Sequence, residues 1–214
     1  MTSPHLDDVR TARTDRRAQL IEVASRLFSE HAYDEVTTTE IAKRANVAYG
    51  LIAHHFSNKR GLYLATILAA AEDLRRAQAT PSEGDSVAEQ LHNGISRHIS
   101  FMDHHAAGFL TLMRGGNGSD PEVRAIIEEM RWEGALRVLR AVGVHEPVHP
   151  VLRAAMRGWV GYLDELIIDH IQHHDVAEET LAQLAITALA TTLRTARSIS
   201  SEIGIDPRTI DTLR

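Results

Sequence analysis

The sequence predicts an all-α protein, in which a small N-terminal three-helix unit is followed by a larger C-terminal helical domain. Apolar residues recur at helical spacing through most of the 214 residues, and no run of alternating apolar and polar residues indicates a strand. Capping residues and breaks that contain Gly or Pro divide the chain into pieces of helical length. A chain of this length can bury the cores of a small and a larger domain.

Residues 37–60, TTTEIAKRANVAYGLIAHHFSNKR, predict two short helices joined by a tight turn. Thr37 and Glu40 have the spacing of a capping box, so the first helix is expected to begin there. Asn46 is expected to end it, because Asn tolerates the left-handed conformation found at helix C-termini. The arrangement is typical of a helix-turn-helix that reads DNA.

The second of these helices is expected to run from Ala48 to Phe56. Its helical spacing turns Leu51 or Ile52 inward together with Phe56. The side chains left to face outward are polar, aromatic or small: Tyr49, Ala53, His54 and His55.

Further helices are expected on both sides of this pair. An amphipathic helix precedes it, with an apolar face made by Leu20, Ile21, Ala24, Leu27 and Phe28. Ser57 or Asn58 is expected to cap a fourth helix that begins near Lys59.

From residue 13 to about residue 70 the chain resembles the TetR family of bacterial transcriptional repressors. The resemblance rests on RRAQLIEVASRLFSEHAYDEVTTTEIAKRANV and on HHFSNKRGLYLATI. Two positions depart from the family pattern. Ala32 stands where the first interhelical link usually has glycine, and Ala53 replaces the tyrosine usual in the middle of the recognition helix. The second departure removes one expected DNA contact.

The resemblance implies a DNA-binding transcriptional regulator, usually a repressor, that binds a palindromic operator as a homodimer. Thr38 and Lys59 are expected to contact phosphates. The other positions expected to face DNA are Thr39, Ala48, Tyr49, Gly50, Leu51, Ala53, His54 and His55. Taken alone, TTTEIAKRAN would also suit a capped surface helix, but three helices in the right order with the right turn lengths favour DNA binding.

Charge is segregated along the chain. The net charge is −6, which by itself argues against nucleic acid as a partner. Residues 10–60, however, carry nine Lys or Arg against six Asp or Glu, whereas residues 80–214 carry 12 against 19. The basic excess therefore coincides with the helix-turn-helix segment.

The rest of the chain predicts a series of longer helices. Ser86 with Glu89, and Asp120 before Pro121, are helix-start signals, and Asp175 is expected to cap the last helix. The helices are expected over 86–104, 105–114, 120–142, 150–173 and 176–202.

The last two long helices are the candidate dimer interface, as the resemblance also implies. Each carries an apolar stripe, which could pair with a second copy or face the chain's own core. The stripes are Leu152, Met156, Trp159, Leu163, Ile167 and Ile171, and Leu181, Leu184, Ala188, Leu189, Leu193 and Ala196.

An effector pocket is expected among the middle helices. By resemblance, a small molecule bound there shifts the fourth helix and lowers the affinity for DNA. An apolar or amphipathic effector is favoured, although any single apolar residue is more often ordinary core than ligand-lining. The candidate lining residues are Phe101, Met102, His105, Phe109, Leu112, Met113, Trp132 and Trp159.

The alternative function is a helical metal-binding protein or enzyme that uses the His-rich C-terminal region. His170, His173 and His174 have the spacing to place two ligands on one helix face, but a third ligand is missing. Histidines near a helix C-terminus also complement its dipole. No nucleophile elbow, phosphate loop or HExxH motif occurs, so no catalytic residue, cofactor or metal site is expected.

The expected organisation is a disordered tail over 1–12, a helix-turn-helix domain over 13–60, a connecting helix over 61–80, and an effector-binding and dimerisation domain over 81–214. The chain has no cysteine, and neither a leader-like N-terminus nor a membrane-length apolar stretch is seen. A cytoplasmic location is therefore expected.

Overall fold

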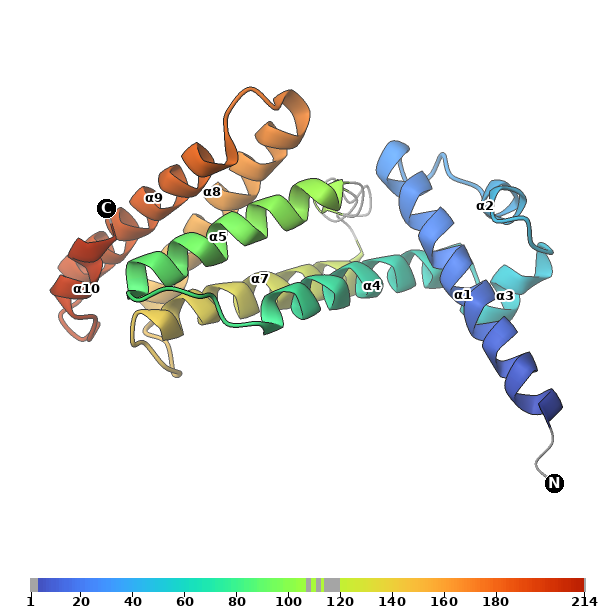
Figure 1. Cartoon of the computed structure of the whole chain (residues 1–214), viewed down its shortest axis with the longest axis horizontal. Helices are drawn as coiled ribbons and strands as arrows, with labels where there is room; N and C mark the ends of the chain where they lie inside the picture. Colours follow the sequence, from blue (N-terminus) through green and yellow to red (C-terminus); the bar gives the residue numbers. More distant parts are fainter. Residues whose placement is uncertain (1–3, 107–108, 111–112, 114–119, 214) are drawn as a thin grey trace. The chain divides into compact units, whose positions relative to one another are not determined.

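The computed structural model describes residues 4–106, 109, 110, 113 and 120–213, and over these residues it contains helices and no strands (Figure 1). The all-α prediction is confirmed. The described residues divide into two compact units, one drawn from 1–73 and 107–126 and the other from 74–106 and 127–214. Among the described helices, none combines the length and the apolar composition that a membrane span requires.

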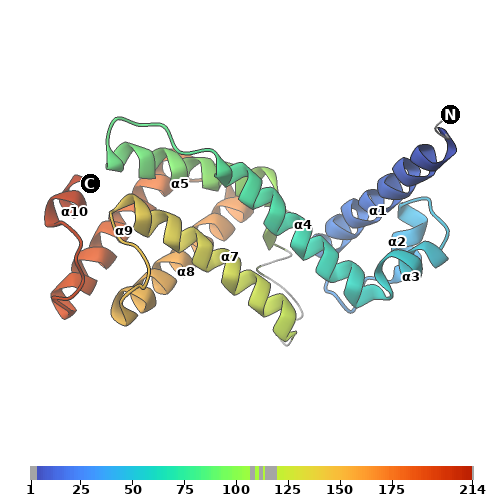
Figure 2. The same ribbon diagram turned by 90° about the horizontal axis from the view of Figure 1, so that it is seen from below.

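Over its described residues, the N-terminal unit is built from three whole helices and parts of two longer ones. The first four in chain order are α1 (Pro4–Glu30), α2 (Thr38–Arg44), α3 (Gly50–Phe56) and the first part of α4 (Lys59–Ala79). The start of α7 (Pro121–Ala141) completes the unit. Helix α1 packs against α2, and α2 against α3, as Figure 2 also shows.

Local signals set the helix ends of this unit. The Thr37 hydroxyl accepts a hydrogen bond from the Glu40 N–H at 3.1 Å, which confirms the predicted start of α2. Asn46 ends it with φ at 49°, as expected. The Asn58 side chain accepts from the Gly61 N–H at 2.9 Å and so caps α4. Helix α3 begins at Gly50, after Tyr49 as its N-cap, and therefore starts later than the predicted Ala48.

Helix α1 also differs from expectation, because it begins at Pro4 and includes most of the segment predicted to be a disordered tail. The sequence gives a reason. Residues 5–30 contain neither Gly nor Pro, so no residue in this stretch strongly opposes a helix.

The core of the N-terminal unit lies where α1, α2, α3 and α4 meet. Aromatic rings form its centre: Tyr63 of α4 is 1% exposed and lies 4.9 Å from Phe28 and 5.0 Å from Tyr33, measured between ring centroids. A Cβ atom on Gly61 would lie 2.0 Å from the Phe56 carbonyl oxygen, so the turn from α3 to α4 requires glycine. Further buried residues of the unit include Leu20, Ala24, Leu27, Ile41, Ala42, Ile52 and Leu62.

The second unit contains the end of α4, most of α7, and four further helices. These are α5 (Val87–His104), α8 (Pro150–His173), α9 (Glu178–Ile199) and the short α10 (Pro207–Thr212). Helices α8 and α9 lie side by side, and α5 packs on both (Figures 1 and 2). The predicted helix at 105–114 falls partly outside the described residues.

One prediction for the last helices is wrong. Helix α9 begins at Glu178 with Ala177 as its N-cap, and no side chain caps it, so Asp175 does not have the predicted role. Most residues of the apolar stripes face inward within one chain, the alternative that the spacing left open. Leu152, Met156, Trp159, Leu163 and Ile167 of α8 are buried, as are Leu181, Leu189, Leu193 and Ala196 of α9. Leu184, by contrast, is 43% exposed, and Ile171 and Ala188 are half-buried. Most of each stripe therefore lies in the unit's own core.

Candidate nucleic-acid interface

Helix α3 has one anchored face and one face open to solvent. Ile52 is 1% exposed and Phe56 is 7% exposed, and these two side chains fix the helix on the unit's core. Tyr49, at the N-cap, is 61% exposed, and Ala53 and His54 are also exposed. These outward positions are the ones expected from helical spacing. Their side chains, two rings and one methyl group, do not take part in the core.

The beginning of α2 lies beside this open face. The Thr38 hydroxyl donates to the Tyr49 hydroxyl at 3.4 Å, so two of the residues expected to face DNA are in contact. Thr39 is exposed next to them. A phosphate contact from α2 and a base contact from α3 can therefore come from one continuous surface.

Gly50 and Leu51 occupy the first turn of α3. Nothing lies within 4 Å of the position that a Gly50 Cβ would take, and no positive φ requires glycine there. Ordering glycine costs more conformational entropy than ordering alanine, and the chain itself gives no steric reason for glycine here. Leu51 is half-buried, and Ala48, the residue before Tyr49, is exposed.

Two cations of the unit lie over aromatic rings. The Lys59 ammonium is 4.3 Å from the centroid of the Tyr33 ring, and the Arg17 guanidinium carbon is 5.2 Å from that of Phe56. His55 is half-buried, and its ring lies beside the rings of its two neighbours on α3, His54 and Phe56. The positioning of Lys59 by Tyr33 had no signal in the sequence, because it depends on the fold.

Arg60, the residue after Lys59, forms hydrogen bonds to acidic side chains. Its Nε and one terminal nitrogen donate to the Asp120 carboxylate at 2.6 and 2.9 Å, and the terminal nitrogen also donates to Glu122 at 2.7 Å. These bonds occupy Arg60, so Lys59 is the cation at the start of α4 that remains suited to a phosphate.

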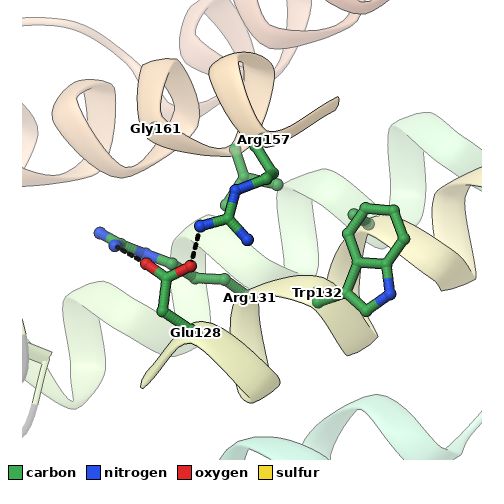
Figure 3. Close-up of a pocket in the computed structure, with 7 residues that line it drawn as sticks. Glu128, Arg131, Trp132, Arg157 and Gly161 are labelled. Carbon is green, nitrogen blue, oxygen red and sulfur yellow. Dashed lines mark hydrogen bonds and ion pairs between the residues drawn. The ribbon is translucent and has the colours of Figure 1, made fainter. Parts of the chain in front are cut away.

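A second candidate site is a pocket between α7 and α8 (Figure 3). It is a partly open hollow of about 60 Å³, which is smaller than a typical site for a drug-sized ligand. Its lining combines an indole, small apolar side chains and charged groups: Glu128, Arg131, Trp132, Ala135, Arg157, Val160 and Gly161.

The charged groups of the pocket form a connected set. Figure 3 shows the Glu128 carboxylate directed to both Arg131 and Arg157, with which it forms ion pairs. Arg131 also pairs with Asp164 at 2.8 Å. Burial raises the pKa of Asp164 to about 6, although the positive charge of Arg131 acts in the opposite direction.

The predicted pocket residues are spread over several environments. Trp132 lines the pocket, whereas Trp159 is buried and donates from its indole N–H to the Ala185 carbonyl at 2.9 Å. Met102 is buried in the second unit, and Phe101 stacks on the exposed His105. Phe109, which is buried, and Met113 belong to the N-terminal unit, and Leu112 lies outside the described residues.

Sequence reasoning missed the polar part of the pocket. Arg131 follows Glu128 by three residues in α7, a spacing that places the two side chains on one helix face. Arg157 of α8 reaches the same carboxylate only because the two helices approach each other, so no spacing marks it.

The first three helices, α1 to α3, together with the exposed face of α3, define a helix-turn-helix protein. Residues 20–66 match the family of bacterial regulatory proteins named after tetR, and residues 87–192 match the tetracyclin repressor-like C-terminal domain. The chain therefore belongs to the TetR family of transcriptional regulators, and the resemblance found in the sequence is confirmed.

Individual relatives agree with this assignment. The chain is 28% identical over 123 residues to the HTH-type transcriptional activator FasR of Mycolicibacterium smegmatis, a match over 56% of the chain that spans about half, 55%, of FasR. A TetR-family regulator from Streptomyces coelicolor superposes with a TM-score of 0.76 at 26% identity, over 94% of this chain and 88% of that one. FadR from Bacillus subtilis, solved with stearoyl-CoA, shares the fold at 22% identity, with a TM-score of 0.58 over 82% and 96% of the two chains.

Proposed function

We propose that the protein is a ligand-responsive transcriptional repressor that binds operator DNA through α3. The exposed face of α3 carries this proposal. Its Tyr49 and His54 side chains are open to solvent, while Ile52 and Phe56 hold the helix on the core. A helix presented in this way fits the major groove of B-DNA, where base edges can be read.

The individual contacts follow from the chemistry of the side chains. Thr38 and Lys59 supply a hydroxyl and an ammonium to phosphates, which fixes the register without reading sequence. Tyr49 and His54 offer hydrogen-bonding groups to base edges, and Leu51 an apolar contact to a thymine methyl. The remaining small and polar positions, Thr39, Ala48, Gly50, Ala53 and His55, complete the surface that faces DNA.

The proposed regulator acts as a homodimer through α8 and α9. Two copies place two recognition helices on half-sites of a palindrome, as a two-fold symmetric operator requires. The faces of α8 and α9 that do not form the core carry exposed apolar and small residues. Tyr162 is 40% exposed and Leu184 43% exposed, and Gly158 and Ala188 lie one helical turn away from them.

The proposed effector is an amphipathic small molecule. The pocket offers Trp132, Ala135 and Val160 to an apolar portion, and an anionic group would compete with the Glu128 carboxylate for the partly exposed Arg157. FadR of Bacillus subtilis, which shares the fold, was solved with stearoyl-CoA. If the effector lowers DNA affinity by some factor, bound DNA must lower effector affinity by the same factor. We place the regulator in the cytoplasm, with the DNA it binds.

Selection of bound duplexes from a random library tests DNA recognition. The native protein should enrich an inverted repeat whose half-sites are centred about one helical turn apart, or a multiple of it. Enrichment of no sequence at low salt would rule out the proposed function.

The effector proposal has a separate test. Binding of long-chain acyl-CoA and of the free fatty acid is measured by calorimetry, on the native protein and on Arg157→Gln. An amphipathic anion should bind the native protein more tightly and should release the selected duplex. A ligand that binds both proteins equally would not use this pocket. FasR is named an activator, so a reporter gene under the selected operator decides the sign of regulation.

A further inference from the structure

Three potential metal ligands from two parts of the second unit, the ends of α5 and α8, meet at one place. Asp103 lies in the last turn of α5, His170 in the last turn of α8, and His174 is the residue that ends α8. Each offers one ligand atom, and these atoms all lie within 4.8 Å of one another. The His174 Nε2 is 3.0 Å from the Asp103 carboxylate.

The backbone directs His174 to this cluster. Its φ of 51° and ψ of 29° are left-handed, a conformation that β-carbon-bearing residues adopt rarely and that ends the helix. His174 follows His170 by four residues, and their ring centroids are 5.0 Å apart. The two imidazoles therefore share one side of the helix end.

His170 is the least expected member, because it is buried with an unmatched polar atom. The residue is 6% exposed, and its Nδ1 has no hydrogen-bond partner. Buried polar atoms are nearly always hydrogen-bonded, and leaving one unpaired is costly. The fold nevertheless holds this ring next to a carboxylate and a second imidazole.

Neighbouring histidines do not take part in the cluster. The His173 ring donates from Nδ1 to the Asp169 carbonyl at 3.0 Å and lies 3.3 Å from that residue's carboxylate. His104 and His105 use their Nδ1 atoms on the Ser100 and Phe101 carbonyls. Each of these rings is exposed and makes its hydrogen bond to the backbone of its own helix.

We propose that Asp103, His170 and His174 bind a divalent transition-metal ion, with Zn²⁺ as the best match. Two imidazoles and one carboxylate are a donor set that Zn²⁺ accepts in tetrahedral geometry, with one position left for water or for another ligand. The bound ion joins the C-terminal end of α5 to that of α8. The sequence already showed the two histidines, and the structure adds Asp103 as the third ligand.

The first test is calorimetric titration of the metal-free, full-length protein with Zn²⁺. The native protein should bind one Zn²⁺ per chain. Asp103→Asn keeps the side-chain shape and removes a charged ligand, and His174→Asn removes the ring but keeps a residue that tolerates the left-handed conformation. Either change should weaken binding by at least about tenfold, the smallest loss expected even for outer-shell partners.

His173→Asn is the matched control, because it removes a ring from the same helix end without touching the cluster. It should leave Zn²⁺ affinity unchanged. No binding by the native protein, or equal losses in the control and in the two ligand variants, would overturn the site.

A second measurement needs no variant. Co²⁺ added to the native protein should give the visible absorption of a low-coordinate nitrogen and oxygen site, and Zn²⁺ should displace it. A spectrum identical to that of hexahydrated Co²⁺ would overturn the proposal even if a variant failed to fold. DNA binding enters neither measurement, so the metal site and the proposed function can fail independently.

Discussion

The Asp120 carboxylate is shared between Arg60, at the beginning of α4, and the beginning of α7. Arg60 donates two hydrogen bonds to it, at 2.6 and 2.9 Å, and the Glu122 N–H donates a third at 3.0 Å. Asp120 is 8% exposed. One carboxylate thus caps α7 and anchors the helix that follows α3.

This relationship predicts an acid-sensitive contribution to stability. The hydrogen bond from Arg60 is the main cause that lowers the pKa of Asp120 from 3.8 to about 2, with burial opposing it. A lowered pKa means that the contribution is fully present above pH 4 and is lost as the pH falls through 2. Asp120→Asn should lower the melting temperature at pH 7, and its difference from the native protein should shrink between pH 4 and pH 2.

The control for this measurement is Asp211→Asn. Asp211 forms an exposed pair with Arg194 at 3.3 Å, and such surface pairs contribute little. A melting temperature at pH 7 that falls equally in both variants would show that the Asp120 arrangement is not special.

Gly50 is predicted to favour operator binding and not the stability of the fold. Gly50→Ala should stabilise the free protein by up to about 1 kcal/mol, because alanine favours the helix and meets no neighbour. The same methyl group should weaken operator binding by crowding the groove. Chemical denaturation and fluorescence anisotropy measure the two effects. Gly134→Ala in α7, whose Cβ would make an ordinary 3.6 Å contact, should leave DNA binding as it is.

The exposed positions of α3 and the start of α4 should differ in the kind of binding they support. Tyr49→Ala or His54→Ala should relax or abolish the preference for the operator over other duplexes. Lys59→Ala should weaken binding to all duplexes and reduce the slope of log affinity against log salt by about one unit. Mobility shifts at several salt concentrations distinguish the two patterns. An unchanged sequence preference in both α3 variants would mean that another surface reads DNA.

The outer faces of α8 and α9 are predicted to hold the dimer together. Tyr162→Glu or Leu184→Glu should weaken the dimer by about 2 kcal/mol or more, as expected for a buried interface residue replaced by a charge. Light scattering after size exclusion measures the mass. Leu68→Glu, which alters an exposed apolar residue of α4, is the control and should leave the mass unchanged. A native protein that is monomeric at micromolar concentration would refute the dimer itself.

The local parts of the fold could be predicted from the sequence because they depend on neighbouring residues. Thr37 binds the Glu40 N–H, Asn46 adopts positive φ, and Asn58 caps α4, each within a few positions of the chain. The same holds for the division of α3 into the buried Ile52 and Phe56 and an exposed face. Helical spacing fixes such a division whatever the rest of the protein does.

The sequence could not show what a buried face packs against. The spacing of the α8 and α9 stripes left open a partner and the chain's own core, and most of their residues lie in the core. Arg60 with Asp120, and His174 with Asp103, join residues far apart in the chain, so spacing contains no signal for them. Trp132 and Trp159 look alike in sequence, yet only Trp132 lines the pocket.

Methylation interference on the selected duplex tests most directly whether α3 reads the major groove. Guanine N7 lies on the major-groove edge, so a methyl group there obstructs a helix that occupies the groove. Interference should occur in two patches about one helical turn apart, and Tyr49→Ala or His54→Ala should alter the pattern within both. Binding by the native protein that no guanine N7 methylation disturbs would contradict an α3 placed in the groove.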